Sequence, residues 1–176
     1  YDFYTKFIEL AAEVNEAMPY HVVELVTEGL SDQGKPLKGS TVLVLGVAFK
    51  PDVDDPRNSP AKRVIELLRV RGADVVYHDP YVPHFCIGDD VFHRDPLEMA
   101  SVALTDDRLD EADCIVIVTG HRAVDYGRVL EHASCVVDTC NATADADGAH
   151  EGVLRLGSGG AGERRSVRVR PAPSSV

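Results

Sequence analysis

The stretch "STVLVLGVAFKPDVDDPRNSP", residues 40–60, decides the fold because it joins an apolar run to a charged loop and a helix start. Residues 42–45 are all apolar and end at Gly46, which is typical of a parallel strand covered on both faces. The loop that follows carries a Phe-Lys pair, three aspartates and one arginine. Ser59 and Pro60 then predict a helix start, because serine caps free amides and proline is preset for the first turn.

Short apolar runs and helical segments alternate along the rest of the domain. After the first strand, the sequence predicts a helix over residues 60–71 that Gly72 closes, strands in "ADVVYH" and "CIVIVT", a helix over residues 126–132, and strands in "CVVDT" and "GVLRLG". The part between "ADVVYH" and "CIVIVT" is interpreted as a long irregular segment. This alternation predicts an α/β fold, a Rossmann-like parallel sheet with flanking helices and right-handed crossovers.

A long helical arm precedes the sheet. Residues 4–33 have apolar side chains at steps of three and four, and we expect Pro19 to kink or divide this helix. The segment "SDQGKPLKGS" then serves as a polar linker. We therefore expect three parts, which are the arm and linker at 1–36, the sheet domain at 37–157 and a disordered tail at 158–176 that is rich in Gly, Ser, Pro and Arg.

Composition excludes some classes of function. The net charge is -11, and residues 1–154 alone carry 13 basic against 28 acidic residues, which argues against nucleic acid as a partner. No apolar run approaches the roughly 18 residues that a membrane span needs, so no membrane association is expected. The four cysteines show no paired CxxC spacing, which favours a reducing cytoplasm. The first residue is Tyr1, and we expect the chain to begin within a longer protein.

The charged loop lies where ligands bind in doubly wound sheets, beyond the carboxyl end of a strand. Lys50 supplies a mobile point charge, and Arg57 supplies a rigid fork suited to phosphate or carboxylate. Asp54 and Asp55 either orient Arg57 or neutralise it. No GxGxxG follows the first strand, so the dinucleotide-binding fingerprint is absent from this position. An anion site and a solvated ion-pair turn both remain open.

Two longer segments carry a family resemblance. "GVAFKPDVDDPRNSPAKRVIELLRVRGADVVYHDPYVP" resembles the C-terminal signature of the UDP-glucose/GDP-mannose dehydrogenase family, and "YDFYTKFIELAAEVNEAMPYHVVELV" resembles the helix that joins its central region to that domain. The resemblance runs from Tyr1 to about Gly157 and is specific, because Phe-Lys, Asp-Asp, Arg, Ser-Pro and Asp-Pro occur in order. "EVNEAMP" and "HDPYVP" are most similar to the bacterial branch that acts on UDP-N-acetylhexosamines.

The resemblance implies a function for the intact protein. Family members use NAD twice to oxidise the C6 alcohol of a UDP-sugar to an acid, through an aldehyde trapped on a cysteine of the central region. That cysteine belongs to a Gly-Gly-x-Cys segment expected shortly before Tyr1, so the chain is expected to be an inactive fragment. Residues 37–157 would be the UDP-sugar-binding domain. Phe49 and Lys50 would contact the UDP-sugar, and Arg57 would reach the NAD phosphates across the cleft.

Some residues depart from the family pattern or suggest other sites. Cys140 stands where relatives have the arginine of Asp-x-Arg-Asn, so that role is not transferred, and no base beside it supports a nucleophile. His78, Asp79 and His84 have the chemistry of metal ligands, but a strand-end turn explains the Asp-Pro pair. His121 follows a strand, and its role is either structural or toward the substrate.

Two classes of function therefore stand side by side. The first is the dehydrogenase domain, with the arm packing in the core or in a homodimer or higher homo-oligomer of the intact protein. The alternative is a non-catalytic, degenerate nucleotide-binding or oligomerisation module. An independent NAD-binding regulator is disfavoured by the missing glycine fingerprint.

Overall fold

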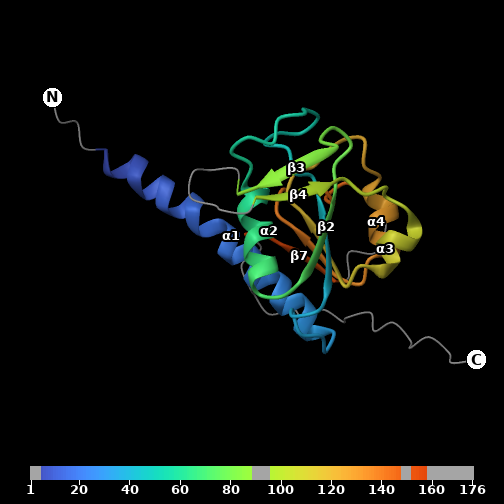
Figure 1. Ribbon diagram of the computed structural model, residues 1–176. Coiled ribbons are helices and arrows are strands. Elements are labelled where there is room, and N and C mark those ends of the chain that lie inside the picture. The colour runs from blue at the N-terminus through green and yellow to red at the C-terminus, as the bar shows by residue number, and fades with distance from the viewer. Residues whose placement is uncertain (1–4, 89–95, 148–151, 158–176) are drawn as a thin grey trace, which may run out of the picture.

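The computed structural model describes residues 5–88, 96–147 and 152–157, and it confirms the α/β prediction (Figure 1). Five parallel strands form one sheet, in the order β2 (Asp74–His78), β1 (Thr41–Leu45), β5 (Cys114–Ile117), β6 (Val136–Asp138) and β7 (Val153–Arg155). The order places β1 between β2 and β5, so the carboxyl ends of these three strands meet at one edge. The tail expected to be disordered, 158–176, lies outside the described residues.

Helices cover both faces of this sheet (Figure 1). One face packs against α1 (Lys6–Asp32) and α2 (Pro60–Val70), and the other against α3 (Asp106–Glu111) and α4 (Tyr126–His132). Strand β1 shows the alternation, since Val42 and Val44 join the first core and Leu43 and Leu45 join the second. All four side chains are fully buried, as expected for a strand covered on both faces.

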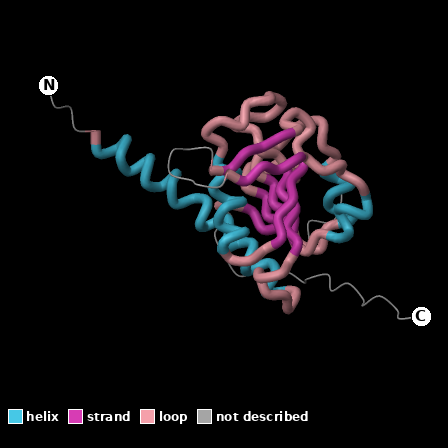
Figure 2. The backbone as a smooth tube through the Cα atoms, viewed as in Figure 1, coloured by secondary structure: helices cyan, strands magenta, loops and turns pink. Residues whose placement is uncertain are grey.

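Helix α1 continues through Pro19, so of the two outcomes expected there, a kink or a division, the division is wrong. Proline removes one donor from the helix ladder, but the turns after it are fixed by buried side chains, including Val23 and Val26. The half before Pro19 extends away from the sheet and leaves Phe7 and Ile8 largely exposed (Figures 1 and 2). Within the described residues, none of the helices has the length and apolarity that a bilayer crossing requires.

The segment interpreted as irregular contains regular structure. Strands β3 (His84–Ile87) and β4 (Leu97–Ala100) form a separate antiparallel pair, so that interpretation is wrong. Phe85 and Ile87 point into the first core, which holds this small sheet against the domain. Helix α3 was not predicted either; the side chain of Thr105, its N-cap residue, accepts the Arg108 amide.

Candidate functional site

The loop between β1 and α2, residues 46–59, lies at the carboxyl edge of the parallel sheet; we call it the β1–α2 loop. It begins at Gly46, which has a φ of 80°. A Cβ atom at this position would lie 2.2 Å from the backbone oxygen of Thr119, which follows β5. The position therefore needs glycine both for its conformation and for the close approach of two strand ends.

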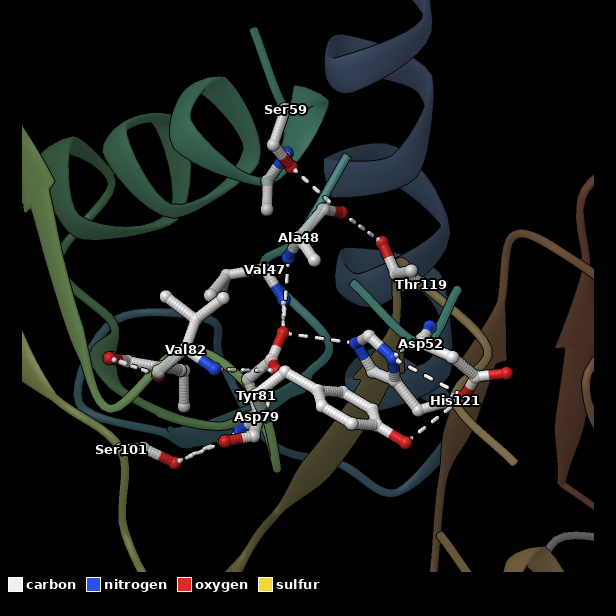
Figure 3. A network of polar contacts seen from close by, with 12 residues as sticks. Val47, Ala48, Asp52, Ser59, Asp79, Tyr81, Val82, Ser101, Thr119 and His121 are labelled. Carbon is white, nitrogen blue, oxygen red and sulfur yellow. Dashed lines mark hydrogen bonds and ion pairs between the residues drawn. The ribbon is translucent and has the colours of Figure 1, made fainter. Parts of the chain in front are cut away.

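Asp79 holds the start of this loop (Figure 3). Its Oδ2 accepts hydrogen bonds from the Val47 and Ala48 amides at 2.7 and 3.0 Å. Its Oδ1 accepts from the Tyr81 and Val82 amides at 2.8 and 3.0 Å. The Asp79 side chain is fully buried, so the carboxylate exchanges water for backbone amides from the β1–α2 loop and from its own turn.

His121 lies between Asp79 and the loop. Its Nε2 is 3.0 Å from Asp79 Oδ2, and its Nδ1 accepts the Asp52 amide at 2.9 Å (Figure 3). Burial raises the pKa of Asp79, but the amide hydrogen bonds and His121 outweigh it and leave that pKa below its ordinary value. Of the two roles expected for His121, these contacts support the structural one, since both ring nitrogens have protein partners.

The end of the loop is tied to its start. The backbone oxygen of Ala48 accepts Thr119 Oγ1 at 2.6 Å and Ser59 Oγ at 3.5 Å. Ser59 Oγ also accepts the Ala61 amide at 3.2 Å, which is the predicted helix cap of α2. The loop is therefore closed on itself at the first turn of α2.

Phe49 and Lys50, the predicted substrate residues, lie together on the loop. Both are exposed, Phe49 at 51%, and Lys50 Nζ lies 5.9 Å from the centre of the Phe49 ring. The Phe49 amide donates to the Asp55 backbone oxygen at 2.8 Å, which fixes the backbone beneath the two side chains. The structure thus displays a cation and an aromatic face at the carboxyl edge of the sheet.

Arg57, the predicted cofactor residue, forms an ion pair with Asp55. Its Nε and Nη2 donate to the two carboxylate oxygens, each at 2.8 Å, and its side chain is 83% exposed. The hydrogen-bonded guanidinium lowers the pKa of Asp55 to about 2. Arg57 therefore shows the contacts of the solvated ion-pair turn, which was one of the two interpretations of the loop.

Two cavities flank the loop in the described part of the chain. The larger is about 750 Å³ and lies between α1 and the start of α2; its lining comprises Asn15, Glu16, Met18, Pro19, Tyr20, Phe49, Asn58, Pro60 and Arg63. The smaller is about 350 Å³ and lies on the other side, with Pro51, His121 and Cys140 in its wall. Phe49 faces the larger cavity, whereas neither Lys50 nor Arg57 lines either of these two spaces.

The remaining candidates are a possible nucleophile and three possible metal ligands, and their surroundings support neither role. Partial burial of the sulfur and the nearby Asp138 carboxylate raise the pKa of Cys140 to about 11, so its thiol stays neutral at pH 7. His78 Nδ1 lies 2.8 Å from the Val102 backbone oxygen, and both carboxylate oxygens of Asp79 accept backbone amides. His84 is exposed on β3. Across residues 5–88, 96–147 and 152–157, no three His, Cys, Asp or Glu side chains gather to hold a metal ion.

Comparison with known proteins assigns the domain. Residues 43–145 match the sequence profile of the UDP-glucose/GDP-mannose dehydrogenase family, UDP binding domain. The UDP-N-acetyl-D-mannosamine dehydrogenase of Methanococcus vannielii is 32% identical over 116 residues, which are 66% of this chain and 24% of that protein. The UDP-glucose 6-dehydrogenase of Bacillus subtilis is 41% identical over 75 residues, or 43% of this chain and 15% of that protein.

A solved structure shares the fold. The UDP-D-ManNAc dehydrogenase of Pyrococcus horikoshii superposes with a TM-score of 0.62 at 26% identity, over 78% of this chain and 30% of that one. The chain spans about a quarter of the length of the first curated relatives it matches. The β1–α2 loop lies wholly within the residues that the family profile covers. The chain therefore belongs to the UDP-glucose/GDP-mannose dehydrogenase family and contains its UDP binding domain.

Proposed function

We propose that the chain is the C-terminal, UDP-sugar-binding part of an NAD-dependent nucleotide-sugar 6-dehydrogenase. The intact enzyme would oxidise the C6 alcohol of a UDP-hexose or UDP-N-acetylhexosamine to the uronic acid. The observation that carries the proposal is the match of residues 43–145 to the UDP binding domain. The geometry supports it, because the charged β1–α2 loop lies at the strand ends where parallel sheets bind ligands.

In this proposal Phe49 and Lys50 contact the UDP-sugar. The Lys50 ammonium is a mobile donor suited to a diphosphate, and Phe49 offers an apolar face beside it. The cavity of about 750 Å³ next to Phe49 is within the size range of small-molecule sites, about 300 to 1,000 Å³. Lys50 does not line this cavity and would reach a ligand there by changing rotamer, which its exposed position permits.

Arg57 is proposed to reach the phosphates of NAD, which accepts hydride when it is bound. A guanidinium fork fits a phosphate as well as a carboxylate, and the exposed pair with Asp55 costs little to exchange. No GxGxxG follows β1, so we place the dinucleotide-binding fold of NAD in another part of the intact protein.

The helical arm is proposed as a packing surface. We assign residues 1–36 to the end of a central helical region and residues 37–157 to the UDP-sugar-binding domain, in a cytoplasmic homodimer or higher homo-oligomer. Phe7, Ile8 and Leu10 support this, because each exposes more than half of its surface on the first turns of α1. The same exposure favours the second candidate, an oligomerisation module without chemistry.

Calorimetric titration of the chain with UDP tests the proposal. Wild-type protein should bind saturably, and Lys50→Ala should weaken binding about tenfold or more, because a charge-assisted hydrogen bond contributes about 1.5 to 3 kcal/mol. Lys6→Ala is the matched control, since it removes an exposed lysine at the far end of α1. Equal affinity of Lys50→Ala and wild type would refute the role of Lys50.

The titration also separates the two candidates. Absence of UDP binding together with a stable dimer in ultracentrifugation would favour the oligomerisation module. With UDP-sugar and NAD, the chain alone should produce no NADH, and robust NADH production would overturn its assignment as the binding part only.

A further inference from the structure

We propose that His121 is a positioning residue, which holds Phe49 and Lys50 in place for the nucleotide by accepting the Asp52 amide on its Nδ1. This inference rests on the proposed function for the ligand, but its structural part stands on contacts within the chain. His121 itself does not touch the ligand in this account. It acts through the backbone of the β1–α2 loop.

The two ring nitrogens of His121 have opposite roles. The Asp52 N–H can only donate, so Nδ1, at 2.9 Å, accepts and carries no proton. Asp79 Oδ2, at 3.0 Å from Nε2, already accepts two backbone amides and is a carboxylate oxygen, so Nε2 donates to it. The geometry therefore requires neutral histidine with its proton on Nε2.

This tautomer places one fixed point on each side of the ligand-facing residues. Before them, Asp79 holds the Val47 and Ala48 amides; after them, His121 holds the Asp52 amide (Figure 3). Because His121 also contacts Asp79, both fixed points belong to one buried unit. Phe49 and Lys50 thus lie on a short backbone segment. Both ends of this segment are hydrogen-bonded to the Asp79–His121 pair.

The backbone conformation of Asp52 is unfavourable, and the hydrogen bond to His121 supports it. The φ of Asp52 is 61°, in the left-handed region that is unfavourable for a residue with a side chain. Its carboxylate accepts the Arg122 amide and Nε, at 3.0 and 2.5 Å, which leaves the backbone N–H to His121. Arg122 is 89% exposed, so the His121 contact is the more buried of the two. Loss of the Nδ1 acceptor would remove the buried support for this backbone conformation.

The groups around the ring fit a fixed neutral histidine. Asp79 faces Nε2, the Asp52 carboxylate lies 4.0 Å from Nδ1, and the Tyr81 ring centre is 5.1 Å from the imidazole centre. The side chain has no exposed surface, although it forms part of the wall of the smaller cavity. The ring is therefore set in orientation from both sides.

Two substitutions divide the roles of the ring. His121→Asn places an amide oxygen near the position of Nδ1 and keeps an acceptor for Asp52, whereas His121→Gln places its amide nitrogen near Nε2 and keeps only the donor to Asp79. We expect the UDP affinity of His121→Asn to stay within about threefold of wild type and that of His121→Gln to fall about tenfold. Equal losses, or the reverse order, would overturn the proposal.

Amide hydrogen exchange provides a readout that does not depend on UDP. The Asp52 amide should exchange slowly in wild type and in His121→Asn, and fast in His121→Gln. A merely structural role would accelerate exchange in both variants across the core. If wild type fails to bind UDP while this pattern holds, the proposed function fails and the positioning contact stands; if Asp52 exchanges alike in all three proteins, the contact itself is refuted.

The tautomer of His121 in the wild-type protein tests the proposal even if neither variant folds. Long-range ¹H–¹⁵N spectra distinguish protonated from unprotonated ring nitrogens. For His121 they should show a proton on Nε2 and none on Nδ1. A proton on Nδ1 would contradict the acceptor role and with it the whole inference.

Discussion

The two halves of the β1–α2 loop differ in how far their polar contacts are exposed to solvent. In the first half, residues 46–52, the Val47, Ala48 and Asp52 backbone amides are held by the side chains of Asp79 and His121, both fully buried. In the second half, residues 55–58, the prominent contact is the exposed pair of Arg57 and Asp55. The side chains that hold the first half are thus buried, whereas the ion pair of the second half lies in solvent.

The difference follows from solvation. A buried donor that loses its acceptor costs about 1 to 3 kcal/mol, because water cannot replace the partner. An exposed ion pair is worth about 0 to 1 kcal/mol, because water and salt compete with it. The first half can therefore orient Phe49 and Lys50, while Arg57 in the second half can exchange Asp55 for another anion.

Asp79→Ala should have the largest effect on the fixed half. The substitution leaves the Val47, Ala48, Tyr81 and Val82 amides without their acceptor, so we expect a loss of about 4 kcal/mol in the free energy of unfolding. Urea denaturation measures it. Asp74→Ala, at an exposed carboxylate that begins β2, is the control and should change stability by less than about 0.5 kcal/mol. Similar losses in both variants would erase the distinction between the halves.

Acidification should lower the free energy of unfolding by protonating the Asp79 carboxylate that accepts these amides. The pKa of folded Asp79 lies below its ordinary value of 3.8, so its stabilising contribution is complete above that value and is lost as the pH falls through the lower, folded pKa. Wild type should therefore lose more stability than Asp79→Asn between about pH 6 and pH 3. Urea denaturation at the two pH values gives the comparison. Parallel losses would show that Asp79 does not contribute to the acid dependence.

Ser59→Ala should have a moderate effect where the loop meets α2. It removes the cap on the Ala61 amide and the long contact to the Ala48 oxygen, which keeps Thr119 as its donor. We expect a loss of about 1 kcal/mol in the free energy of unfolding, typical of a helix N-cap. Ser59→Thr keeps a hydroxyl and should restore most of it. No recovery would mean that packing, not capping, is what Ser59 supplies.

Asp55→Asn should have the smallest effect on stability. The pair with Arg57 is exposed, so we expect the free energy of unfolding to change by less than about 0.5 kcal/mol. The change leaves the backbone oxygen that accepts the Phe49 amide in place. Thermal denaturation measures the difference. A loss comparable to that of Asp79→Ala would show that the second half is as fixed as the first.

Much of the sheet could be predicted from the sequence, because its signals are local. The apolar run of β1, the Ser59-Pro60 start of α2 and the 126–132 helix all depend on neighbouring residues, and the structure confirms them. The β3–β4 pair was missed because each strand has four residues and its partner lies farther along the chain than a tight hairpin would place it. The division at Pro19 was wrong because burial of the following turns overrides helix propensity.

The site was predictable only in part, because some of its contacts join residues that are far apart in the sequence. The sequence placed Phe49, Lys50 and Arg57 in one loop at a strand end, and the structure keeps them there. It could not pair Asp79 with His121, which are 42 positions apart and meet only because β2 and β5 flank β1. The available signal was positional, since Asp79 directly follows β2 and His121 lies shortly after β5.

The most direct test of the fixed first half as the nucleotide site is a ¹H–¹⁵N spectrum of the labelled chain during titration with UDP. The largest shifts should occur at the Phe49 and Lys50 amides, and the Asp52 amide should stay protected from exchange throughout. Shifts confined to Arg57 and its neighbours, or to residues away from the carboxyl edge of the sheet, would contradict the account.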